Sequence, residues 1–75
     1  MDIALARTFL MVAETGSFIE AARKMNITQS TVSARIKGLE ELLGRPLFER
    51  SKSGAELTGA GQQFQKHALA LVRVW

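Results

Sequence analysis

The chain has 75 residues, with ten lysines and arginines against seven acidic residues and a formal net charge of +3, so it forms one small basic domain or part of one. It has no cysteine, which excludes disulfides and thiolate metal sites, and its one histidine leaves no metal-ligand spacing. No apolar run could span a bilayer and no signal peptide opens the chain, so a cytoplasmic protein without membrane contact is expected.

The first expected helix covers residues 2–15 and starts at a capping aspartate. Leu5, Phe9 and Val12 or Ala13 recur at helical spacing and give this helix an inward face. It carries a single base, so its simplest role is to cover the core. A part in a dimer contact is the alternative.

A second, short helix is expected to start at Ser17, because SFIE has the form of a capping box. In that motif Ser17 accepts the amide of Glu20, and Glu20 reaches back to the amide of Ser17. Phe18 and Met25 are expected in the core. Asn26 tolerates a left-handed backbone and can end the helix.

The segment Thr28 to Gly44 reads as one amphipathic helix. Thr28 can cap its start, Gly44 suits the left-handed residue after its end, and Pro46 blocks any continuation. An apolar stripe recurs at four, three and four residues: Val32, Ile36, Leu39 and Leu43. Two short helices joined by a tight turn indicate a helix-turn-helix.

The polar side of this helix lacks acids in its first half. No acidic residue occurs from position 21 to 39, while four bases do: Arg23, Lys24, Arg35 and Lys37. A face of small and hydrogen-bonding residues without negative charge can approach base edges and phosphates closely. An ordinary solvated helix face is the alternative, because charge patterning is a weak signal. Acids return at Glu40 and Glu41, so the contact surface is expected in the first two turns.

Two short strands are expected after this helix, over about residues 47–50 and 55–57, with a polar tip between them. Such a ribbon is a wing, and its Arg50 and Lys52 could reach neighbouring phosphates or the minor groove. A plain connecting hairpin is the alternative, and Glu56 favours it slightly.

A final helix is expected from Thr58 onward, although Gly59 and Gly61 weaken its start. It carries an apolar stripe at four, three and four residues, widened by two more apolar residues; the dimerisation set is Phe64, Ala68, Leu71, Val72 and Trp75. Nothing in this short chain obviously covers the stripe, so burial against a second copy is expected. His67 is interpreted as a bystander.

The run SFIEAARKMNITQSTVSARIKGLEELLGRPLFER, followed by LTGAG, resembles the N-terminal domain of LysR-type bacterial transcription regulators. The resemblance covers nearly the whole chain, with its motifs in the family order. It implies a winged helix-turn-helix and a long linker helix that pairs antiparallel with that of a second subunit. It further implies a tetramer on inverted repeats and a C-terminal domain that binds a small-molecule effector, which we expect to lie outside these residues.

Carried over position by position, the resemblance implies DNA contacts from helix starts, from the second helix of the motif and from the wing. With the wing-tip lysine, the expected set is Ser17, Thr28, Gln29, Ser30, Thr31, Ser33, Arg35, Lys37, Arg50 and Lys52. Four positions depart from the family pattern. Ser30 stands where proline is frequent and Ala34 where arginine is frequent, and the wing has Ser53 and Glu56 where many members are basic. Gln29 is the best candidate for base readout, because an amide can pair with adenine N6 and N7.

We therefore predict a mainly α chain: a winged helix-turn-helix of three helices and a two-stranded wing over residues 1–57, then a linker and dimerisation helix over 58–75. Its expected function is sequence-specific binding of double-stranded DNA, with the recognition helix in the major groove of an inverted-repeat operator. A winged helix that contacts another protein is the main alternative. An enzyme is not expected, since the chain lacks nucleophile, phosphate-loop and paired-carboxylate signatures, and no cofactor is expected.

Overall fold

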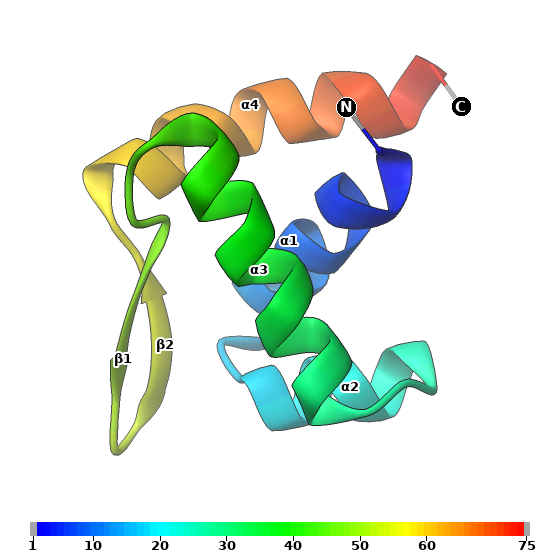
Figure 1. Ribbon diagram of the computed structural model, residues 1–75, viewed down its shortest axis with the longest axis vertical. Helices are drawn as coiled ribbons and strands as arrows, with labels where there is room; N and C mark the ends of the chain where they lie inside the picture. The colour runs from blue at the N-terminus through cyan, green and yellow to red at the C-terminus, as the bar shows by residue number, and fades with distance from the viewer. Residues whose placement is uncertain (1, 75) are drawn as a thin grey trace.

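The computed structural model describes residues 2–74, which form four helices and one two-stranded antiparallel sheet. In chain order the elements are α1 (Ile3–Thr15), α2 (Phe18–Met25), α3 (Gln29–Leu43), β1 (Phe48–Ser51), β2 (Gly54–Leu57) and α4 (Gly59–Val74). The β1–β2 hairpin stands beside α3, and α4 lies across the end of the molecule that also holds the start of α1 (Figure 1). This arrangement confirms the predicted winged helix-turn-helix followed by a further helix.

Polar side chains cap the start of each helix, as the sequence predicts. A backbone amide of the first turn donates to each cap, over 2.9 to 3.1 Å; the caps are Asp2, Ser17, Thr28 and Thr58. The second half of the predicted capping box is wrong. Glu20 pairs with Arg23 at 2.7 Å, and the amide of Ser17 donates instead to the Thr15 hydroxyl at 3.3 Å. An exposed guanidinium is a better partner for this carboxylate than a neutral amide that already has an acceptor.

The turn between α2 and α3 occupies residues 26–28. Asn26 adopts the predicted left-handed conformation, with φ of 58°, and the amide of Ile27 donates to the carbonyl of Ala22 at 3.0 Å. Gly44 ends α3 in the same conformation, with φ of 72°. A backbone hydrogen bond between the turn and the end of α2 therefore stabilises the connection between the two helices of the motif.

Phe9 of α1 is the centre of the core. Its ring is fully buried, 5.2 Å from the ring of Phe48 in the wing and 5.0 Å from that of Phe64 in α4. The buried face of α1 consists of Ala6, Thr8, Phe9 and Val12, whereas Leu5 and Ala13 are half-buried. Phe9 and Val12 are therefore buried as predicted, whereas Ala6 takes the place expected for Leu5 on the face of α1 that meets α2, α3 and α4.

Two other core predictions need correction. Leu43 is exposed, because it lines an open hollow between the end of α3 and α4 instead of entering the core. Met25 is half-buried at the end of α2. The remaining stripe of α3 is buried as predicted.

Helix α4 packs on α1, so its apolar stripe is partly covered within the chain. Phe64 is only 7% exposed and Ala68 is fully buried, while Leu71 and Val72 are half-buried against the same core. The premise that nothing in the chain covers this stripe is therefore wrong: Phe64 and Ala68 belong to the core of their own subunit, because the face that carries them meets α1. Trp75 lies outside the described residues.

Three attachments fix the wing to the helices. The Glu40 carboxylate accepts the amides of Leu47 and Phe48, at 2.7 and 3.4 Å. The amide of Ala55 donates to the carbonyl of Gly16 at 2.9 Å, in the turn between α1 and α2. The wing is therefore held from both strands, and its orientation relative to α3 is set by hydrogen bonds as well as by Phe48.

None of the helices in residues 2–74 combines the length and the apolar character that crossing a membrane requires.

Candidate nucleic-acid interface

The polar face of α3 is presented to solvent at its first turns. Gln29, Ser30, Ala34 and Lys37 are exposed, and Ser33 is half-buried. The helical period explains the pattern, since Val32, Ile36 and Leu39 point into the core and these residues fall on the remaining faces. The exposed surface of residues 29–37 thus carries hydroxyl, amide, methyl and ammonium groups and no carboxylate.

A groove runs between the start of α2, the start of α3 and the wing. Its lining, which we call the wing groove, contains no acid and consists of Ser17, Phe18, Ile19, Gln29 and residues 50–54. The groove measures about 280 Å³, at the lower limit of small-molecule pockets, which are typically ~300–1,000 Å³.

The fold brings four of the sequence-predicted DNA-contacting residues together in the wing groove. Ser17 comes from the first helix of the motif, Gln29 from the second, and Arg50 and Lys52 from the wing. A neighbouring hollow between α3 and the wing adds Ser33 and Lys37 and is also lined by Arg50. Six of the ten predicted residues therefore line two hollows that share the side chain of Arg50.

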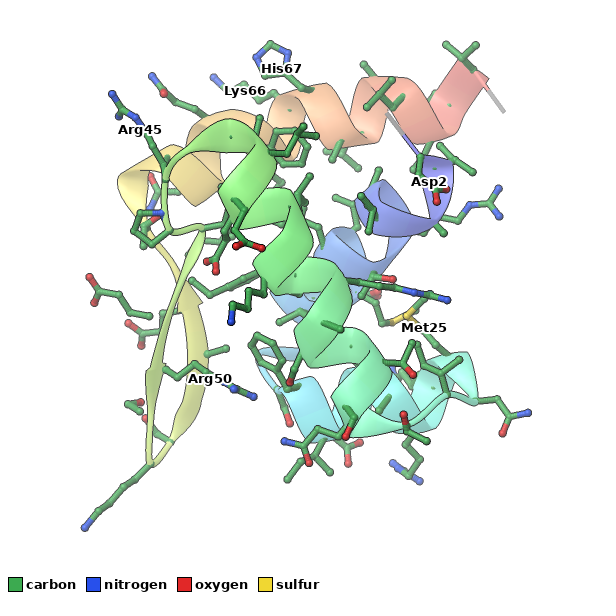
Figure 2. All side chains as sticks on the ribbon, in the orientation of Figure 1. Asp2, Met25, Arg45, Arg50, Lys66 and His67 are labelled. Carbon is green, nitrogen blue, oxygen red and sulfur yellow. The ribbon has the colours of Figure 1, made fainter. Side chains whose placement is uncertain are left out.

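Arg50 lies over the ring of Phe18. Its guanidinium carbon is 3.6 Å from the ring centroid, and Figure 2 shows the side chain extending from β1 toward the helices. Arg50 shares a strand face with the buried Phe48 two residues earlier. The wing therefore presents this arginine to the helix-turn-helix. On the opposite strand face Glu49 and Glu56 are paired across the hairpin.

The other predicted residues lie outside the two hollows. The hydroxyls of Thr28 and Thr31 are 2.9 Å apart at the start of α3, so each serves the local cap. Ser30 is exposed beside them. Arg35 is half-buried and donates to the hydroxyl of Thr8 on α1 at 3.2 Å, which gives it a structural partner that the sequence did not predict.

One ion pair occurs within residues 2–74, between Arg23 and Glu20 on the surface of α2. The hydrogen bond from Arg23, together with its charge, lowers the pKa of the Glu20 carboxyl, and Glu20 in turn raises the pKa of Arg23. Both side chains therefore stay charged, and the adjacent carboxylate offsets the positive charge of Arg23. Over the part of the chain that the structure describes, no three His, Asp or Glu side chains cluster as metal ligands would.

Sequence reasoning missed three contributors to this surface. From the sequence Glu40 only bounds the contact surface, but its carboxylate anchors the wing. Phe18 was expected only in the core, yet its ring also supports Arg50. Ile19 is 63% exposed at the mouth of the wing groove. The sequence carries a signal for Ile19, because this apolar residue at the start of α2 lies off the inward stripe of Phe18, Ala21 and Ala22.

A winged helix-turn-helix in which the starts of two helices and the wing line one groove without a carboxylate has the architecture of a DNA-binding domain. The family model described as bacterial regulatory helix-turn-helix protein, lysR family, matches residues 3–62. The chain belongs to the LysR family of bacterial transcription regulators.

Named relatives agree with this assignment. The chain is 48% identical over 69 residues to the HTH-type transcriptional regulator IlvR of Caulobacter vibrioides. The aligned residues make up 92% of this chain and 23% of IlvR. It is 43% identical over 75 residues to the transcriptional regulator HdfR of Escherichia coli, covering 100% of this chain and 27% of HdfR. The chain thus spans about a quarter of the length of the curated relatives it matches, and those relatives are regulators rather than enzymes.

Solved structures of DNA complexes share the fold. Full-length CbnR with its target DNA matches with a TM-score of 0.95 and 34% identity, covering 99% of this chain and 26% of CbnR. The BenM DNA-binding domain with catB site 1 DNA matches with a TM-score of 0.91 and 37% identity, covering 97% of this chain and 82% of that one. The structure therefore has the fold of LysR DNA-binding domains.

Proposed function

We propose that this chain binds a specific sequence in double-stranded DNA, with α3 in the major groove and the wing on the adjacent backbone. The observation that carries the proposal is the convergence of Ser17, Gln29, Arg50 and Lys52 on one groove without a carboxylate. In a DNA duplex, phosphates flank a groove in which the base edges are exposed. This surface offers cationic side chains that can donate to phosphates and an amide that can donate to base edges. The DNA complexes of CbnR and BenM support the proposal by similarity.

In this mode Gln29 reads a base, because its exposed amide stands at the first position of α3 and can pair with adenine N6 and N7. Ser30, Ser33 and Thr31 contact bases or phosphates near it. Phosphate is bound mainly by cations; these are Lys37, Arg50, Lys52 and, in part, Arg35. The starts of α2 and α3, at Ser17 and Thr28, add backbone amides and a favourable helix dipole for a phosphate.

The proposal is tested by fluorescence anisotropy with labelled duplexes of random sequence at low salt, followed by selection of bound sequences from a random pool. We expect micromolar binding to random duplexes that weakens steeply with salt, and tighter binding to one selected half-site. Absence of any duplex binding at micromolar protein favours the alternative, a winged helix that contacts another protein. Selection also reports half-site spacing.

We also propose that two copies associate through α4 and place their α3 helices in successive major grooves of an inverted repeat, one helical turn apart. Phe64 and Ala68 are buried in their own subunit, so we assign the contact with a second copy to an exposed stripe of α4, which consists of Gln63, His67, Ala70 and Val74. Val74 is 84% exposed, and Leu71 lies half-buried beside it. Residues 58–75 would then serve dimerisation and residues 1–57 DNA binding.

Sedimentation of the chain as a function of concentration tests this association. We expect a dimer that Ala70→Glu converts to a monomer, because a carboxylate at the centre of the stripe would be buried without a partner. A monomer at all concentrations, or a dimer unaffected by Ala70→Glu, contradicts the proposal. For the full-length protein we propose tetramers in the cytoplasm and an effector-binding domain, by similarity to the family.

A further inference from the structure

The ring of Phe18 is a fixed platform beneath Arg50. Phe18 is only 7% exposed, and its ring meets that of Phe48 edge-on at 5.9 Å. Phe48 in turn packs on Phe9 at the centre of the core, at 5.2 Å. The rings of Phe9, Phe48 and Phe18 thus form a chain of contacts that joins α1, the wing and α2. These contacts fix the ring of Phe18 beneath the guanidinium of Arg50.

The way that Arg50 meets this ring leaves its hydrogen-bonding capacity free. The guanidinium carbon is 3.6 Å from the ring centroid, which is the distance of direct contact with the ring face. Its five N–H donors lie in the guanidinium plane and are not consumed by a contact through the flat face. Within residues 2–74 no carboxylate forms an ion pair with Arg50. The donors remain available to a ligand in the wing groove, which Arg50 lines.

Fixing an arginine before binding lowers the entropic cost of using it. An arginine side chain has many rotamers, and part of this rotamer entropy is lost when it engages a phosphate. A side chain already stacked on a rigid ring loses less. The wing hairpin alone would not provide this, because Arg50 is an exposed residue near the hairpin tip.

We propose that Phe18 is a positioning residue for DNA binding: its ring holds the Arg50 guanidinium where it donates to a backbone phosphate beside the half-site. This inference rests on the proposed function. It assigns to the first helix of the motif a role in placing the wing contact, in addition to its own contact through Ser17.

The test replaces Phe18 with a ring-fluorinated phenylalanine, which keeps nearly the same shape but weakens the negative face of the ring. Affinity for a duplex is measured for this protein, for Arg50→Ala and for the combination. We expect a loss of about two- to fivefold from fluorination when Arg50 is present, the size of an exposed cation–π contact, and no loss in the Arg50→Ala background. The non-additivity identifies the coupling between the two side chains.

Two controls separate positioning from folding. The same fluorinated residue at Phe64, which is buried in the core away from the wing groove, should leave affinity unchanged. Thermal unfolding of each protein should show that the fold is retained; if fluorination unfolds the chain, Phe18→Leu provides the same cycle without the π face.

Three results overturn the inference. An equal loss with and without Arg50 means that Phe18 acts only through the fold, and no loss in either background means that the contact is irrelevant to binding. A gain in affinity means that Arg50 must leave the ring to reach DNA. If the unmodified chain itself binds no duplex, the proposed function has failed, and the inference falls with it.

Discussion

Arg35 of α3 donates to the hydroxyl of Thr8 on α1 at 3.2 Å, and Thr8 is fully buried. The Thr8 hydroxyl donates its own proton to the carbonyl of Ala4 at 2.7 Å, so its oxygen is oriented to accept from the guanidinium. The middle of α3 is thereby attached to the helix that carries the core residue Phe9. Arg35 thus contributes to the position of α3 as well as to the positive charge of its surface.

Thr8→Val tests this attachment, because valine keeps the shape of threonine and removes the acceptor. We expect the free energy of unfolding to fall by about 1 kcal/mol and the Tm by about 4–8 °C, with DNA affinity retained well below the Tm. Arg35→Ala should show a similar loss of stability, whereas Lys37→Ala, a change on the exposed face, should lower affinity alone. A normal Tm for Arg35→Ala with a reduced salt dependence of binding would instead make Arg35 chiefly a phosphate contact.

Glu40 should determine the stability of the wing. Its carboxylate accepts the amide of Leu47 at 2.7 Å, and Leu47 is buried, so loss of the acceptor leaves a donor without a partner. Glu40→Ala is expected to lower the free energy of unfolding by about 1–3 kcal/mol in urea denaturation. The adjacent Glu41 is exposed, and Glu41→Ala should change it by less than about 0.5 kcal/mol. Equal effects of the two substitutions would show that Glu40 acts only through its charge.

Gln29 should determine sequence preference rather than overall affinity. Gln29→Ala is expected to cost about 1–3 kcal/mol on the selected sequence and to relax preference at one base pair, while binding to random duplexes changes little. Competition with a panel of single-base variants measures this. Gln62→Ala, the same change at an exposed position of α4, serves as the control. An unchanged preferred sequence after Gln29→Ala would show that the base is read elsewhere.

Lys52 should act as a phosphate contact without sequence information. Lys52→Ala is expected to weaken binding to all duplexes alike and to reduce the slope of log affinity against log salt by about 0.9, as loss of one phosphate contact does. Lys66→Ala removes the same charge from the exposed surface of α4 and should leave the slope unchanged. If both variants lower the slope equally, net charge rather than a wing contact controls binding.

Signals that are local in sequence predicted this fold well. Thr28 caps α3 and Asn26 turns the chain because each feature depends on neighbouring residues only. Contacts between distant segments were harder to predict. The stripe on α4 was correctly read as apolar, but periodicity does not say whether α1 or a second copy covers Phe64 and Ala68. Likewise the spacing of charges could not distinguish Glu40, bonded to backbone amides seven and eight residues away, from a solvated acid.

The site shows the same division. The acid-free face of α3 and the bases of the wing were visible in the sequence, and the fold brings Gln29, Arg50 and Lys52 to one groove. The sequence did not show which residue each of the two arginines contacts. Arg35 meets a hydroxyl on α1 and Arg50 meets a ring on α2, and both partners are fixed by packing that a linear pattern does not encode.

At Gly61 a close contact with the start of the wing outweighs the low helix propensity of glycine. From sequence this glycine weakens the start of α4, yet it is buried where a Cβ would overlap the carbonyl oxygen of Leu47 and crowd the Leu57 side chain at 2.9 Å. That carbonyl accepts the amide of Thr58 at 3.0 Å, so the backbone cannot shift easily. Gly61→Ala is therefore expected to lower the free energy of unfolding by about 1–3 kcal/mol despite the better helix former.

Gly38 of α3 is the matched control, because nothing lies within 4 Å of the position its Cβ would take. Gly38→Ala should raise the free energy of unfolding by up to about 1 kcal/mol, the ordinary difference in helix propensity. Urea denaturation of both variants measures the opposite signs. Stabilisation by Gly61→Ala would mean that α4 does not approach the start of the wing as closely as the structure places it. The attachment of α4 to the DNA-binding domain would then need to be revised, because the close approach at Gly61 is what seats the first turn of α4 against Leu47.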